Sequence, residues 1–119
     1  MRTLLITLVL LLITVPVMAA SVTLMWEAPT LNEDGSPLTD LAGYRLFRGD
    51  VSGTYPVSVD VGNITIYSWD VGEQEGNTLF FNATAYDTSG NESVYNGEVN
   101  LTFPMIAPSP PTNLQGVVD

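Results

Sequence analysis

The feature that most constrains this chain is a period-two alternation of apolar residues from residue 22 to residue 103. In VTLMWEA, Val22, Leu24 and Trp26 share one face of an extended strand, because successive side chains of a strand point to opposite sides. Five later segments alternate in the same way: 42–48, 55–61, 67–71, 79–87 and 98–103. No window from residue 20 onward has a helical stripe, so the sequence predicts an all-β chain.

The alternation also predicts which side chains lie on the same face of each strand. Tyr55, Val57, Val59 and Val61 are expected on one face of their strand, and Pro56 within it indicates a sheet edge. The other expected inward residues are Tyr44, Leu46, Tyr67, Trp69, Val71, Leu79, Phe81, Ala83, Ala85, Val99, Leu101 and Phe103. In the strand 79–87, Phe80, Asn82, Thr84 and Tyr86 are expected to point outward.

The segments between the strands carry turn signals. In DTSGNE, Gly90 and Asn91 are expected to supply positive φ angles. Six short strands separated by such turns are typical of an antiparallel β-sandwich or a small barrel.

Composition narrows the chemistry. With 119 residues the chain has room for about one domain, and the absence of Cys requires an apolar core rather than disulfides. From residue 20 onward two arginines stand against 13 acidic residues, a net charge of −11. This charge repels phosphate backbones and anionic lipids, so we expect neither nucleic-acid binding nor membrane-surface binding.

The N-terminus has the layout of a secretory signal peptide. Arg2 is followed by an apolar block from Leu4 to Val15, then Pro16 and small residues. We expect residues 1–19 to be removed after Ala19, or alternatively after Ala20. An uncleaved membrane anchor is the competing interpretation, since the apolar run approaches the ~18 residues that span a bilayer. After cleavage we expect no membrane insertion, and a secreted or cell-surface location.

Three segments resemble a known family. SVTLMWEAP, DLAGYRLFRG and ATAYDTSGNES are similar, in order and spacing, to strand B, strand C and strands F to G of fibronectin type III domains, as found singly in bacteria, phages and secreted glycan-processing proteins. The resemblance covers about residues 22–103 and implies an immunoglobulin-like antiparallel β-sandwich over residues 20–103. It implies that Trp26 is a core residue, with Tyr44 and Leu46 packed across from it.

The chain departs from this family in two ways. Leu79 stands where the family has a Tyr whose hydroxyl ties down a loop. The expected first strand, strand A, is missing before Val22, and a segment of its type occurs instead in the proline-rich tail, residues 104–119, as PSPPTNLQGVVD.

Four interpretations of Pro108–Asp119 stay open. The segment begins a further module of a tandem array, or it folds back into its own domain's strand A position. Alternatively it adds as a strand to another molecule and builds a polymer, or it is a disordered linker.

Enzyme chemistry is not expected. The segment from residue 20 onward has no His, Cys or Lys, hence no familiar base for a serine nucleophile and no Schiff-base amine. We expect no catalytic residues, no cofactor and no metal. Asn32, Glu33, Asp34 and Asp40 gather in one loop that can be considered for Ca²⁺, but they lack EF-hand spacing and are interpreted as a solvated loop.

Two candidate binding sites follow. Arg48-Gly49-Asp50 is the tripeptide that some type III domains display to integrins, although a simple turn explains it equally. Phe80 and Tyr86 are expected on one outward face, where they can contact a sugar or a protein. Glycosylation sequons begin at Asn63, Asn82, Asn91 and Asn100.

The sequence therefore predicts a secreted, non-enzymatic interaction or structural module with a protein or glycan partner. The alternatives are a subunit of a surface polymer that assembles through its C-terminal strand, and an accessory glycan-binding domain.

Overall fold

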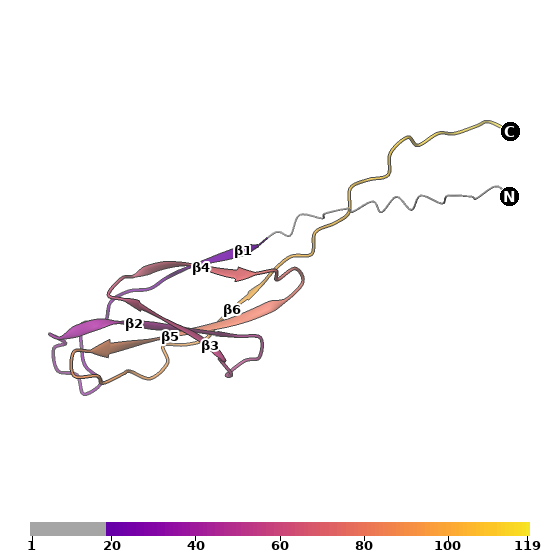
Figure 1. The fold of residues 1–119 in the computed structure, drawn as a ribbon. Helices are drawn as coiled ribbons and strands as arrows, with labels where there is room; N and C mark the ends of the chain where they lie inside the picture. Colours follow the sequence, from indigo (N-terminus) through magenta and orange to yellow (C-terminus); the bar gives the residue numbers. More distant parts are fainter. Residues whose placement is uncertain (1–18) are drawn as a thin grey trace, which may run out of the picture.

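The computed structural model describes residues 19–119, and this part of the chain contains six β-strands and no helix (Figure 1). The strands are β1 (Ala20–Met25), β2 (Leu41–Gly49), β3 (Val57–Gly62), β4 (Ile66–Gly72), β5 (Thr78–Asp87) and β6 (Val99–Thr102). The all-β prediction and the six expected strands are confirmed. The expected signal peptide lies outside the described residues except for Ala19.

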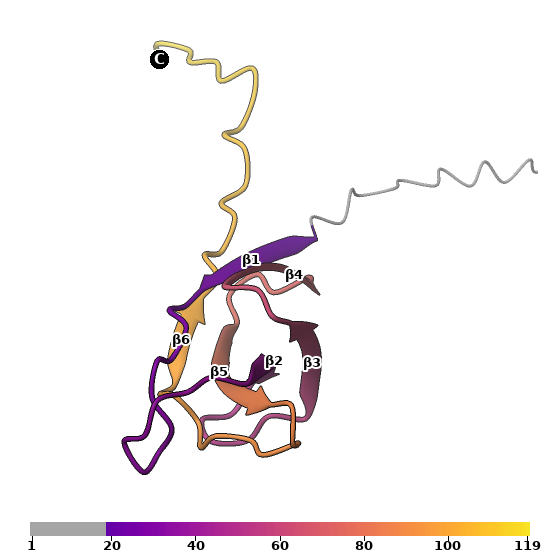
Figure 2. The same ribbon diagram turned by 90° about the vertical axis from the view of Figure 1, so that its left-hand side faces the viewer.

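The strands form two antiparallel sheets (Figure 2). One sheet contains only β1 and β4, and the other has the order β3-β2-β5-β6. The two sheets share one apolar core, to which both contribute buried side chains: Val22, Leu46, Trp69, Val71, Leu79 and Phe81. The molecule is therefore a two-layer β-sandwich with four strands facing two.

The core sits between β4 and the middle of the larger sheet. Leu46 and Phe81 are its largest fully buried side chains, and the Phe81 ring meets the Trp69 ring with centroids 6.1 Å apart. Trp26 contacts Tyr44 at a centroid distance of 5.4 Å, a contact that the resemblance implies. Trp26 is only half-buried, however, so the fully packed tryptophan is Trp69.

The expected face of Tyr55 is wrong. β3 begins after Pro56, at Val57, and lies at the edge of its sheet as predicted. Val59 and Val61 pack against the core, but Tyr55 lies on the outer face, with its ring 6.3 Å from that of Phe47. The alternation is lost because the Tyr55-Pro56 step precedes the strand and does not follow its pleat.

The outer face of β5 is less exposed than its alternation suggests. Asn82 and Thr84 are buried under side chains: the Thr84 hydroxyl donates to Glu92 of the segment 92–98, and the Asn82 amide group donates to the Tyr55 hydroxyl. The amides of Asn96 and Gly97 donate to the Ala83 carbonyl and to Asn82 Oδ1, at 3.0 and 3.1 Å. The segment 92–98 therefore runs along the β6 side of β5 without regular strand pairing, and its side chains cover part of the outer face.

The turn after β5 uses one positive φ angle where two were expected. Gly90 has φ 86°, but Asn91 is not in the left-handed region. Asn91 instead donates its amide to the Asp87 carboxylate at 2.9 Å, and its side chain donates to the same group. This bonding lowers the pKa of Asp87 and holds the turn closed.

The tail leaves the sandwich at the turn between β4 and β5. The Phe103 amide donates to the Asn77 carbonyl at 2.8 Å, and the Ile106 amide donates to the Glu75 carboxylate at 2.7 Å. Within the described part of the chain, residues 107–119 make no hydrogen bond to the sandwich, and Figures 1 and 2 show them running away from it. The structure thus does not show the tail folded back into its own domain.

Candidate functional site

One long side of the sandwich has a free strand edge in the described residues. The first component of this side is that edge, which belongs to β1. Within residues 19–119, β1 pairs only with β4. The Trp26 amide donates to the Thr65 carbonyl on the β4 side at 3.0 Å. Since the bonding direction alternates along an antiparallel pair, Ser21, Thr23 and Met25 direct their backbone groups toward the free edge.

The second component is the inner face of β6. Val99 lies opposite Phe81 and Leu101 lies opposite Leu79, so these two residues face the interior as the sequence predicts. Val99 is nevertheless 51% exposed and Leu101 is 37% exposed, whereas Phe81 and Leu79 are 2% and 5% exposed. The two-stranded sheet ends at β1 and does not extend over β6.

A small groove of about 60 Å³ connects these two components. Leu24, Met25 and Trp26 line it from the β1 side and Val99 from the β6 side, while the core residue Phe81 also borders it. We call the free edge of β1, this groove and the inner face of β6 the open side. It extends along β1, and its lining is mostly apolar.

The open side is also uncharged. Neither the segment 20–26 nor the segment 99–103 contains a charged residue, although the chain as a whole carries 13 acidic residues. An unpaired, apolar sheet edge without charge is the type of edge that pairs with another strand. The open side is therefore the candidate functional site.

The Arg48-Gly49-Asp50 tripeptide is not displayed as a unit. The Arg48 side chain turns inward, with its guanidinium 5.1 Å from the Trp69 ring centroid and within 3.5 Å of the Val71 carbonyl. Gly49 is buried, and an added Cβ would collide with the Thr54 carbonyl oxygen, so a close backbone approach requires glycine there. Only Asp50 is exposed.

Phe80 and Tyr86 lie on the same face of β5 but do not form a continuous stripe. Buried Asn82 and Thr84 separate them, where side chains of the segment 92–98 pack on β5. The Tyr86 hydroxyl donates to Asp60 at 2.7 Å, and the Arg45 guanidinium lies 5.8 Å from its ring. This hydrogen bond lowers the pKa of Asp60 and raises that of Tyr86.

The structure brings together a different aromatic cluster that the sequence did not indicate. Tyr95 packs against Phe47 and Tyr55 with ring centroids 5.1 and 5.3 Å apart, on the outside of the four-stranded sheet. Glu98 accepts hydrogen bonds from Ser52, from the Gly53 amide and from the Tyr55 hydroxyl, and its pKa is lowered, chiefly by Ser52. Tyr95 lies in an irregular segment, so no periodicity signalled it.

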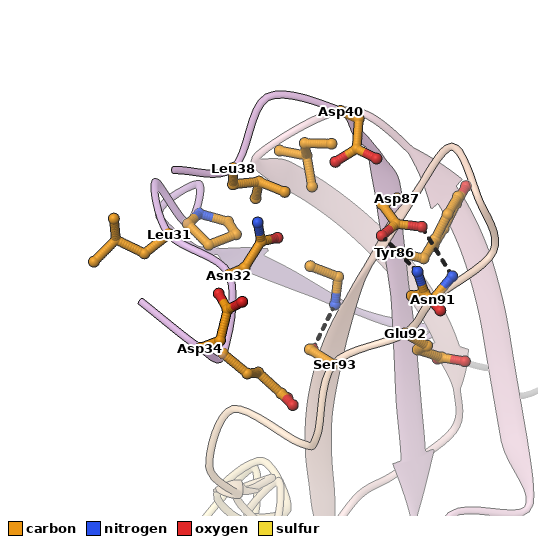
Figure 3. Close-up of a pocket in the computed structure, with 14 residues that line it drawn as sticks. Leu31, Asn32, Asp34, Leu38, Asp40, Tyr86, Asp87, Asn91, Glu92 and Ser93 are labelled. Carbon is orange, nitrogen blue, oxygen red and sulfur yellow. Dashed lines mark hydrogen bonds between the residues drawn. The ribbon is translucent and has the colours of Figure 1, made fainter. Parts of the chain in front are cut away.

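The acidic loop borders a shallow pocket of about 480 Å³ at one end of the sandwich (Figure 3). Asn32 and Asp34 are used within the loop itself: the Asn32 amide donates to the Ser36 carbonyl, and Asp34 accepts from the Ser36 amide at 2.9 Å. The hydroxyl and amide of Ser36 lower the pKa of Asp34. Among residues 19–119 no three acidic, His or Cys side chains gather as a metal site.

The four sequons differ in accessibility. Asn63, Asn91 and Asn100 are exposed, whereas Asn82 is 8% exposed and its side chain is hydrogen-bonded to Tyr55 and to the Gly97 amide. Attachment of a glycan to Asn82 is incompatible with this packing.

Comparison with known proteins returns no relative. No family model matches the chain, and neither does any curated protein or solved structure. In the described residues no helix is long and apolar enough to cross a membrane.

Proposed function

We propose that this chain is an exported, non-enzymatic interaction module that works by accepting an extended strand on its open side. The observation that carries the proposal is the 51% exposure of Val99 and the 37% exposure of Leu101, two residues that face the interior of the sandwich. Adding one strand beside β1 would cover both of them and would pair the free backbone groups of β1.

The order of the strands supports a fibronectin type III-like fold for this module. In the resemblance, β1 takes the place of strand B, β2 that of strand C and β5 that of strand F. β6 lies within strand G. A strand A added to β1 would complete the smaller sheet. Such modules act as spacers, adhesion surfaces or binding platforms, which agrees with the net charge of −11 from residue 20 onward and with the lack of a catalytic side-chain set.

Glycan binding and integrin-type adhesion have less support. Tyr86 is engaged by Asp60 and Arg45. Arg48 packs on Trp69, away from Asp50. A sugar-binding platform needs aromatic faces that are free, and a displayed tripeptide needs its two charged side chains on one surface.

Hydrogen–deuterium exchange of the dilute, monomeric protein tests the proposal. We expect the Thr23 amide to exchange rapidly, because it faces the free edge, while the Leu24 amide is protected by β4. These adjacent residues in one strand are an internal control. A protected Thr23 amide in the monomer would contradict the proposal, since another part of the chain would then cover the edge.

A further inference from the structure

We propose that the strand accepted by the open side is the C-terminal tail of a second copy of this chain, so that copies join head to tail. This inference rests on the proposed function and names its partner. In the complex, Leu114, Gly116 and Val118 face the interior, and Asn113, Gln115 and Val117 face outward.

The tail has the properties of an unpartnered strand. Leu114, Val117 and Val118 are 94%, 90% and 99% exposed. No charged residue occurs from Pro104 to Val118, so the acidic charge of the tail is confined to its last residue, Asp119. Both the donor segment and the open side are uncharged and apolar, and they match in length and character.

The direction of the chain favours a second copy over the tail's own domain. Ala20 pairs with Gly72, and the Phe103 amide bonds to Asn77, so β1 begins and β6 ends at the same turn, 73–77. The two strands therefore run in opposite directions (Figure 1). A tail that continues along the direction of β6 is antiparallel to the β1 strand of a copy stacked beyond it.

Closure onto the tail's own domain needs a longer path. To pair antiparallel with its own β1, the tail must first return along the six residues of that strand, about 20 Å, and then reverse. Residues 107–112 contain three prolines, and as a stiff spacer of about 3.1 Å per residue they span no more than about 20 Å. This spacer is barely long enough for the return and leaves no residues for the second turn.

The test uses the full chain as exported, with its N-terminus read from the intact mass, and light scattering over a range of concentrations. A donor-blocked variant carries Leu114→Asp and Val118→Asp, and its charge-matched control carries Asn113→Asp and Gln115→Asp on the outward face. An acceptor-blocked variant carries Thr23→Pro, which removes an edge-facing amide without disturbing the pairing with β4, and Thr23→Ser is its control.

We expect the wild type and both control variants to form a ladder of oligomers that grows with protein concentration and with salt, which screens the repulsion between copies. Each blocked variant alone should remain monomeric, with association weakened more than about tenfold by the loss of two apolar contacts. An equimolar mixture of the two blocked variants should form a one-to-one dimer and nothing larger. This dimer identifies the tail of one copy in the open side of another.

Other outcomes overturn the inference in distinguishable ways. A wild type that is monomeric at every concentration contradicts the inference. The exchange rate of the Thr23 amide then tests the proposed function separately. If that amide exchanges rapidly, the open side exists but takes another strand. If it is protected, and Leu114→Asp with Val118→Asp removes the protection, the tail closes its own domain. Association that is lost in Thr23→Pro but kept in the donor-blocked variant indicates edge-to-edge pairing of β1 strands.

Thr23→Pro depends on the fold being retained, so a second acceptor variant is included. Val99→Asp places a carboxylate on the inner face of β6, at a position that is already half exposed in the monomer. We expect it also to remain monomeric. Mixed with Thr23→Pro it should form no dimer, because the acceptor side of both variants is blocked. An unchanged ladder from a folded Val99→Asp protein would contradict the proposed binding mode.

Discussion

β5 and β6 are neighbouring strands of one sheet, and they experience different environments. On β5, Phe81 and Leu79 are 2% and 5% exposed, while their direct partners on β6, Val99 and Leu101, are 51% and 37% exposed. All four side chains point to the same face of the sheet. Neighbouring strands lie only about 4.8 Å apart, yet a position on β5 is in the core and its partner on β6 is at the surface.

The difference arises from the opposite layer. The smaller sheet has two strands and the larger has four, so β1 and β4 cover the middle of the larger sheet and leave β6 uncovered. The comparison shows that an apolar alternation identifies the inward face of a strand, whereas burial depends on the number of strands that lie across from it.

The largest expected effect on stability comes from truncating two side chains on the same face, one on β5 and one on β6. Phe81→Ala should lower the free energy of unfolding by about 3–5 kcal/mol, because it leaves a cavity beside Trp69. Val99→Ala should lower it in the monomer by less than about 1 kcal/mol, because that side chain is half exposed. Urea unfolding of dilute protein measures both values. Equal losses would mean that β6 is covered in solution, contrary to the open side.

A second pair compares the outer faces of the same two strands. Asn82→Ala should destabilise by about 1–3 kcal/mol, since it removes a buried side chain that accepts from the Gly97 amide and donates to the Tyr55 hydroxyl. Asn100→Ala, on exposed β6, should change stability by no more than about 0.5 kcal/mol. Thermal unfolding followed by tryptophan fluorescence distinguishes them. A negligible effect of Asn82→Ala would show that the segment 92–98 does not cover β5.

The smallest effect concerns Glu98, which joins that covering segment to the turn at residues 52–55. Its pKa is lowered below the ordinary 4.5 by its hydrogen bonds, so its ionised form stabilises the fold above that pH. This contribution is lost as the pH falls through the lowered pKa. Glu98→Gln should reduce the melting temperature by no more than about 3 °C at neutral pH.

The pH dependence gives the sharper test of Glu98. The difference in melting temperature between wild type and Glu98→Gln should shrink as the pH falls from about 5 to about 3. Glu27→Gln removes the same charge at an exposed position and is the control. A difference that stays constant with pH would contradict the role of the Glu98 carboxylate.

Much of the fold followed from the sequence. The alternation in VTLMWEA and LFFNATAYD assigned Val22, Leu79 and Phe81 to the inner face, and all three are buried. Pro56 correctly indicated an edge strand. These predictions hold because the pleat of a strand forces adjacent side chains to opposite faces, whatever the rest of the molecule does.

The candidate sites were less predictable. The alternation of Tyr44 and Leu46 places Arg48 on the same inner face, but nothing in the order of residues indicated that its partner would be Trp69, or that Tyr95 would pack on Phe47 and Tyr55. These contacts join segments that are far apart in the sequence. The signal for the open side was present only indirectly, as a strand-like segment in the tail and none before Val22.

By itself, the sequence determined where the strands lie, which face most of their side chains take and where the chain turns; the exception is Tyr55, which precedes its strand. These are local properties, set by the alternation of side chains and by the backbone preferences of Gly and Pro. Only the tertiary structure decided that Asn82 and Thr84 are buried and that Val99 and Leu101 are not. Burial is decided by what packs across from a face, and among the described residues the layer opposite β6 ends at β1.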